Sequence, residues 1–107
     1  MFFLMRCIHH PDMDAQRDAL RPTHRDWVKS AGGNSASCLI GSALWKDDGS
    51  ALGHFGILQA ESGAKARAFA EGDPFNTGGV VAEIHITRLA DGFQSDRVSE
   101  WMSRVSG

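Results

Sequence analysis

The sequence lacks the charge excess and the cysteine pattern that would assign a class directly. Its 107 residues carry a net charge of −2, so no basic field is available to attract nucleic acid, and we expect no nucleic-acid partner. The two cysteines, Cys7 and Cys38, have no Cys-x-x-Cys spacing and lie within apolar runs. We expect both to be reduced core residues, with a disulfide between them as the open alternative.

Long hydrophobic runs are absent as well. The apolar start of the chain, residues 1–5, is interrupted by Arg6 and is too short for a signal sequence or a membrane span. We therefore expect a cytoplasmic protein that does not bind membranes. A chain of this length has room for one domain.

Several chemical motifs are missing. Gly53 and Gly56 lack the lysine and the strand-to-helix setting of a phosphate loop, and no Ser-His-Asp order is present. The segment from His9 to Asp14 holds metal-capable side chains, but adjacent histidines at a strand end point to opposite faces and match no ligand spacing. We expect no metal and no cofactor.

The segments that remain predict alternating strands and helices. Residues 2–9 could form a strand or a buried helix, and their length and two phenylalanines favour a strand. A helix is predicted to begin at Pro22 and run to Ala31, with any turn before it separate or kinked, because proline fits a first helical turn and disrupts an interior. The other predicted elements are strands 37–45 and 51–60 around an Asp-Gly hairpin turn, an alanine-rich helix 64–71 capped by Ser62, and strand 79–89.

This order predicts an α+β fold: a ferredoxin-like β-α-β-β-α-β antiparallel sheet with two helices on one face. Two helices cover only one side of the sheet, yet the first strand is apolar on both sides, with Phe3 and Met5 on one and Phe2 and Leu4 on the other. An uncovered apolar face is an association site, so we expect a homodimer packed sheet to sheet. Residues 91–107 are expected to form a short helix or an arm that packs on the domain or on its partner.

Two segments resemble the YciI-like (YCII-related) family. Arg21-Pro22-Thr23-His24 is similar to the family's Arg-Pro-x-His, and the stretch from Glu61-Ser62 through Asp73-Pro74-Phe75 to Gly79-Val80 is similar to its helix, Asp-Pro-aromatic and Gly-Val pattern. The resemblance covers residues 3 to about 89, so we assign residues 1–90 to a YciI-like domain. It implies a dimeric α+β barrel, a His–Asp pair formed by His24 and Asp73, and acid/base activity on small, often ring-shaped molecules.

The chain departs from the family pattern at two places. The second strand carries Gly41-Ser42-Ala43 where the family often has Ala-Gly-Pro, and the last strand carries Thr87-Arg88 where the family often has Lys-Pro. Both segments could line the cleft. The substrate class is therefore not carried over.

Each candidate residue also has a purely structural interpretation. His24 would lie near the helix start, where the helix dipole and partial burial favour the neutral ring that a general base needs; otherwise it is a core histidine. Asp73 would orient His24, or else cap a local turn. Arg21 could clamp an anion, and the other candidate substrate-binding residues are Arg6, Ser42, His54 and Phe75.

These residues lead to one main hypothesis and two alternatives. The main one is a small cofactor-independent acid/base enzyme, lyase- or isomerase-like, that binds a small organic molecule. The first alternative is a non-catalytic dimeric small-molecule-binding or accessory domain. The second is a structural dimer module.

Overall fold

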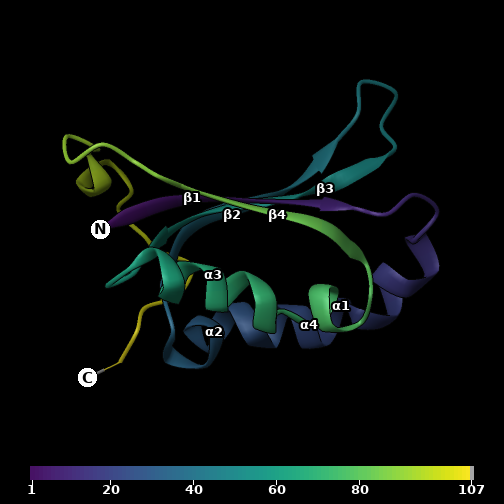
Figure 1. Cartoon of the computed structure of the whole chain (residues 1–107), viewed down its shortest axis with the longest axis horizontal. Coiled ribbons are helices and arrows are strands. Elements are labelled where there is room, and N and C mark those ends of the chain that lie inside the picture. The colour runs from purple at the N-terminus through teal and green to yellow at the C-terminus, as the bar shows by residue number, and fades with distance from the viewer. Residues whose placement is uncertain (107) are drawn as a thin grey trace.

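The computed structural model describes residues 1–106 and consists of a helix layer under a four-stranded antiparallel sheet with strand order β2-β3-β1-β4 (Figure 1). The α+β prediction is confirmed. In chain order the elements are β1 (Phe2–His9), α1 (Asp14–Lys29), α2 (Ala31–Asn34), β2 (Ser37–Trp45), β3 (Ala51–Gln59), α3 (Gly63–Gly72), α4 (Pro74–Thr77), β4 (Val81–Arg88) and the 3-10 turn η1 (Ser95–Arg97). None of the helices in the described residues is long and apolar enough to cross a membrane.

The core lies between the sheet and the helices, because alternate side chains of each strand point to opposite faces. On β1, Phe3, Met5 and Cys7 are buried, and Phe69 of α3 packs against them. Both cysteines are buried free thiols, so no disulfide forms in the structure. Burial raises the pKa of Cys7 to about 12 and that of Cys38 to about 11, as expected of inert core residues.

In the described part of the chain, none of the helices α1 to α4 covers the opposite face of the sheet (Figure 1). Leu4 of β1, Ile57 of β3 and Ile40 of β2 lie side by side across three strands on this face, and 42% of Ile40 is exposed. At one end of the face, Phe2 contacts the C-terminal segment through Phe93 and Trp101. We refer to Leu4, Ile40 and Ile57 as the outer apolar row.

The predicted start of the first helix is wrong. The helix begins at Asp14, and Pro22 lies inside it. An interior proline removes one backbone hydrogen bond and costs about 3 kcal/mol in an isolated helix. Here the turns before Pro22 are held by tertiary packing, since Arg17 is buried and Leu20 packs against the core. Local propensity favoured a break, and packing overrode it.

The predicted hairpin is confirmed almost to the residue, with β2 and β3 joined by a turn in which Gly49 has φ 85°. Gly53 has a different role on β3. A Cβ atom at this position would lie 2.0 Å from the Cys7 carbonyl oxygen on β1. Glycine is therefore required for the two strands to approach, and the next residue along β3 is His54.

The C-terminal segment runs along the edge of the sheet. The Ser103 amide donates to the Cys38 carbonyl and the Cys38 amide donates to the Ser103 carbonyl, each at 3.1 Å. Arg104 lies 4.0 Å above the Trp101 ring. The segment thus packs on the domain of its own chain as an arm with one short turn, η1. Gly107, the last residue of the predicted tail, lies outside the described residues.

Candidate functional site

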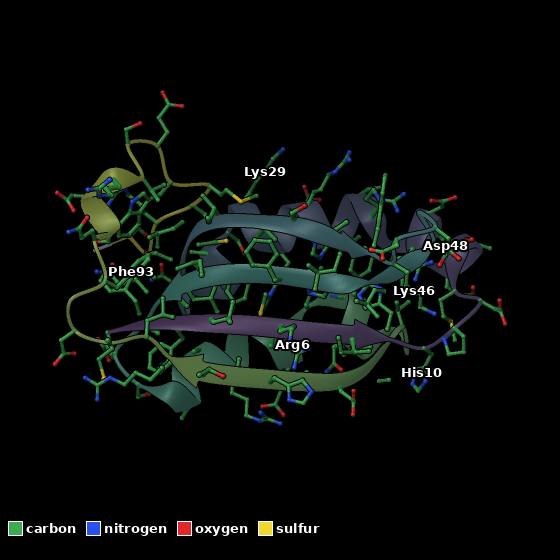
Figure 2. The ribbon with its side chains drawn as sticks, turned by 90° about the horizontal axis from the view of Figure 1, so that it is seen from above. Arg6, His10, Lys29, Lys46, Asp48 and Phe93 are labelled. Atoms are coloured by element: carbon green, nitrogen blue, oxygen red, sulfur yellow. The ribbon has the colours of Figure 1, made fainter. Side chains whose placement is uncertain are left out.

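A cavity of about 670 Å³ lies between α1 and the β2–β3 side of the sheet, a size typical of small-molecule sites. The lining includes all but one of the residues predicted from the sequence: Arg21, His24, Ser42, His54, Asp73 and Phe75. The exception is Arg6. It is exposed on β1, whose buried side chains are Phe3, Met5 and Cys7, so it points to the outer face of the sheet (Figure 2).

His24 and Asp73 lie in contact, although 49 residues separate them in the sequence. His24 Nδ1 is 2.8 Å from both carboxylate oxygens of Asp73, and the exposed fractions of the two side chains are 18% and 1%. An ionised carboxylate only accepts hydrogen bonds, so His24 Nδ1 is the donor. In the neutral ring the lone pair is then on Nε2, where a general base needs it.

The setting of His24 differs from the one predicted. Because α1 begins at Asp14, His24 lies in the second half of the helix and not near its positive end. The helix dipole therefore gives no reason for a neutral ring, and that part of the prediction is wrong. The pair forms because Asp73 lies between α3 and α4, and α4 packs on α1 beside His24.

The backbone around Asp73 explains its direction. Pro74 restricts the residue before it to extended conformations, and Asp73 has φ −60° and ψ 132° between α3 and α4. Its Oδ1 atom accepts the Phe75 amide at 2.8 Å, which caps the first turn of α4. The same carboxylate thus caps a turn and contacts His24.

Phe75 fixes the plane of the histidine. The two rings are stacked, with centroids 4.1 Å apart and planes inclined by 10°. Next along α1, Trp27 Nε1 donates to the Phe69 carbonyl of α3 at 2.9 Å, which ties the two helices together beside the site. The imidazole is therefore held both in its plane and at its Nδ1 atom.

Sequence reasoning missed two residues of the site, His9 and Arg17. His9 Nε2 lies 2.8 Å from His54 Nδ1, and Arg17 donates to His9 Nδ1 at 3.3 Å and also pairs with Asp14. The alternation that placed Cys7 on the inner face also places His9 there, so this signal was available. Arg17 was hidden by the expectation of a helix break before Pro22.

The two buried histidines are neutral near pH 7. Burial lowers the pKa of His9 and of His54 from 6.5 to about 4, and the Arg17 charge adds to the effect on His9. Ring stacking extends the cluster, with the His24 and His54 centroids 5.5 Å apart in an edge-to-face arrangement. The cavity therefore holds three imidazoles and one carboxylate.

One wall of the cavity is basic. Arg17, Arg21, Arg25 and Lys29 follow each other at four-residue intervals on α1 and all line the cavity. Arg21 also pairs with Asp18 at 2.6 Å. Opposite charges are attracted to such a wall, so the cavity favours molecules with an anionic group.

The remaining histidines lie outside the cavity. His85 is exposed on β4, 3.8 Å from Glu83, and His10 is exposed beyond the end of β1 (Figure 2). Within residues 1–106, no three histidine, cysteine or acidic side chains are placed together to hold a metal ion.

The sequence profile of the YCII-related domain matches residues 1–90 of the chain. A solved structure that resembles it is 5-chloro-2-hydroxyhydroquinone dehydrochlorinase from Burkholderia phenoliruptrix AC1100, in complex with 2,5-dihydroxybenzoquinone. The two chains are 25% identical with a TM-score of 0.72, over 86% of this chain and 96% of the other. No protein of curated function matches this chain.

Proposed function

The chain belongs to the YCII-related domain family, and from that premise we propose that it is a small acid/base enzyme of the lyase type, acting on a small cyclic organic molecule with an acidic hydroxyl group. His24 is the general base, Asp73 orients it, and Arg21 binds the anionic oxygen. No metal or cofactor takes part in the proposed step. The related dehydrochlorinase, which acts on a chlorinated hydroxyhydroquinone, supports this reaction class.

The observation that carries the proposal is the His24–Asp73 pair in the wall of the cavity. With Nδ1–H held by the carboxylate, His24 Nε2 takes a proton from the substrate hydroxyl, and the resulting imidazolium is stabilised by Asp73. For 5-chloro-2-hydroxyhydroquinone this takes two steps. First, the hydroxyl group next to the C–Cl carbon loses its proton and that ring carbon gains one, which gives a ketone with chlorine on a tetrahedral carbon. Then His24 takes the proton of the hydroxyl group para to the ketone, the O–H electron pair forms the second carbonyl, the ring double bond shifts, and chloride leaves with the electrons of the C–Cl bond. The products are the quinone, chloride and one proton on His24, so atoms and charge balance.

The direct test is the release of chloride from 5-chloro-2-hydroxyhydroquinone, which a chloride electrode follows. The binding of 2,5-dihydroxybenzoquinone is measured in a separate experiment. Turnover above the rate without protein supports the enzyme. Binding without turnover supports the alternative, a small-molecule-binding domain that keeps the cavity and performs no chemistry. If the protein neither binds 2,5-dihydroxybenzoquinone nor releases chloride, the proposed substrate class is contradicted.

Arg21 provides a second test of the anion-binding wall. Replacing Arg21 with Gln removes one charge-assisted hydrogen bond, so we expect the Kd for 2,5-dihydroxybenzoquinone to rise about tenfold, which corresponds to about 1.4 kcal/mol. Calorimetric titration measures it. The control is Arg97→Gln, because Arg97 is exposed on η1 and pairs with Gln94 away from the cavity. An unchanged Kd in Arg21→Gln would remove Arg21 from the site.

We also propose a homodimer formed through the outer face of the sheet. The outer apolar row of Leu4, Ile40 and Ile57 supports it: in the single chain Ile57 is buried, but Ile40 is 42% exposed and Leu4 is partly exposed, and a partner would cover both. Sedimentation at micromolar concentration is expected to give twice the chain mass, and Ile40→Glu is expected to give a monomer. Val105→Glu is the matched control, since Val105 has the same exposed fraction, 42%, and lies on the C-terminal segment. A wild-type monomer would contradict the proposal.

A cytoplasmic location stays part of the proposal. It is supported by the two buried thiols, Cys7 and Cys38, which are unpaired as expected in a reducing compartment.

A further inference from the structure

A buried series of polar side chains leads from α1 along the inner face of the sheet to Asp73. Arg17 of α1 contacts His9 of β1, His9 contacts His54 of β3, and His54 Nε2 lies 3.9 Å from Asp73 Oδ2. Arg17, His9, His54 and Asp73 are each at most 8% exposed. The His24–Asp73 pair alone does not require the first three, so their burial calls for another reason.

The donor and acceptor roles along this series of side chains follow from its first member, Arg17. An arginine side chain has N–H donors and no acceptor, so His9 Nδ1 must be the acceptor. A neutral His9 then carries its proton on Nε2 and donates it to His54 Nδ1, 2.8 Å away. His54 Nδ1 is thereby an acceptor, and the proton of the neutral His54 ring is on Nε2. The lowered pKa values of both rings, about 4, agree with neutral rings at pH 7.

The proton on His54 Nε2, at the end of this series of side chains, has no hydrogen-bond partner among the described residues. His54 Nε2 is buried and makes no hydrogen bond within the described part of the chain, and a separation of 3.9 Å from Asp73 Oδ2 is too long for one. An unpaired buried donor costs about 1–3 kcal/mol. Asp73 accepts N–H groups from His24 and Phe75, and a carboxylate has about four acceptor positions, so Oδ2 has room for another donor.

We propose that Arg17 and His9 are positioning residues that hold His54 in its neutral Nε2–H tautomer, and that this N–H closes onto Asp73 Oδ2 when the site is occupied. His54 then shares the carboxylate with His24 and fixes its orientation from the second side. The other tautomer would direct the His54 Nε2 lone pair at the carboxylate, and two acceptors repel each other. The assignment of the tautomer rests on geometry alone; its consequence for turnover rests on the proposed function.

The charged and titratable groups that face His54 are the ones already named. From α1 they are His24 and, through His9, Arg17 with its partner Asp14. From the start of α4 it is Asp73, and from β1 they are His9 and the buried thiol of Cys7, which is opposite His54 in the strand register. Arg17 is the only cation in direct contact with this histidine pair among the described residues, so its removal is the informative change.

Long-range ¹H–¹⁵N spectra of ¹⁵N-labelled protein at pH 7 test the assignment without any substrate. In the wild type, His9 and His54 are expected to be neutral with the proton on Nε2. In Arg17→Met the constraint on His9 is lost, so at least about one tenth of His54 should adopt the Nδ1–H tautomer, and Arg17→Lys should restore the wild-type pattern because lysine also only donates. His85→Gln, outside the cavity, serves as assignment aid and control.

The wild-type spectrum decides the assignment even if Arg17→Met fails to fold. A His54 proton on Nδ1, or a charged His54 at pH 7, would overturn it, and so would an unchanged His54 in a folded Arg17→Met. With the chloride-release assay, Arg17→Met is expected to lower kcat about tenfold with KM within twofold, and Arg17→Lys to recover most of it. If no substrate is turned over but the tautomers are as expected, the tautomer assignment for His9 and His54 stands and the proposed reaction is contradicted.

Discussion

Replacing His24 with Asn is expected to lower kcat for chloride release roughly 10²- to 10⁴-fold, the range found when a general base is removed. Asparagine keeps a donor near the position of Nδ1, so the contact to Asp73 and the fold should survive. It has no basic nitrogen in place of Nε2. Binding of 2,5-dihydroxybenzoquinone should change much less than kcat, because Arg21 and the cavity walls remain.

The matched control is His85→Asn, which removes an exposed histidine of β4 outside the cavity and should leave kcat unchanged. Circular dichroism confirms that both variants are folded. If His24→Asn retains kcat within about threefold of the wild type, His24 is not the base, and the binding-domain alternative takes over for this chain.

Acid is expected to destabilise the protein well above the pH at which most carboxylates titrate. The pKa values of His9 and His54 are lowered from 6.5 to about 4, so between these pH values the unfolded chain binds protons that the folded chain does not. Stability then falls as pH falls, by up to about 1.4 kcal/mol per pH unit for each histidine. The two shifts do not add in full, because part of the shift of His54 comes from the charge on His9, and we expect a combined loss on the order of 3–4 kcal/mol between pH 7 and pH 4.

Urea unfolding at pH 6.0, 5.5 and 5.0 measures the slope in a range where carboxylates contribute little. In His9→Gln one of the two groups is gone, and the slope of the unfolding free energy should fall by about half. His10→Gln is the control, since His10 is the exposed neighbour of His9. Equal slopes in the wild type and in His9→Gln would show that His9 is protonated in the folded protein.

The sequence was sufficient for the sheet and for the central pair. The Asp-Gly turn located β2 and β3, and the resemblance of the Arg-Pro-x-His and Asp-Pro-Phe segments to the family pattern pointed to His24 and Asp73. Proline's restriction of the residue before it made the extended backbone at Asp73 predictable. These are local rules, and each acts within a few residues.

What the sequence did not reveal depends on packing over long distances. A helix through Pro22 forms only because Arg17 and Leu20 are buried against other elements, and no local signal reports that. The His9–His54 contact joins residues 45 apart through the β1–β3 register. Arg6 was expected at the site but lies on the outer face of the sheet. A charged residue within an apolar strand does not indicate which face of the sheet the helices cover.

Asp73 serves both the fold and the candidate site. Its carboxylate closes the first turn of α4 through the Phe75 amide and also binds His24. A descendant that had lost its substrate would still need the aspartate to fold well, because losing such a cap costs about 1 kcal/mol. Selection for stability alone would then preserve the Asp-Pro-Phe segment over evolutionary time. If the proposed function is correct, a basic ring at the position of His24 is therefore a better marker of that activity in relatives of this chain than the aspartate.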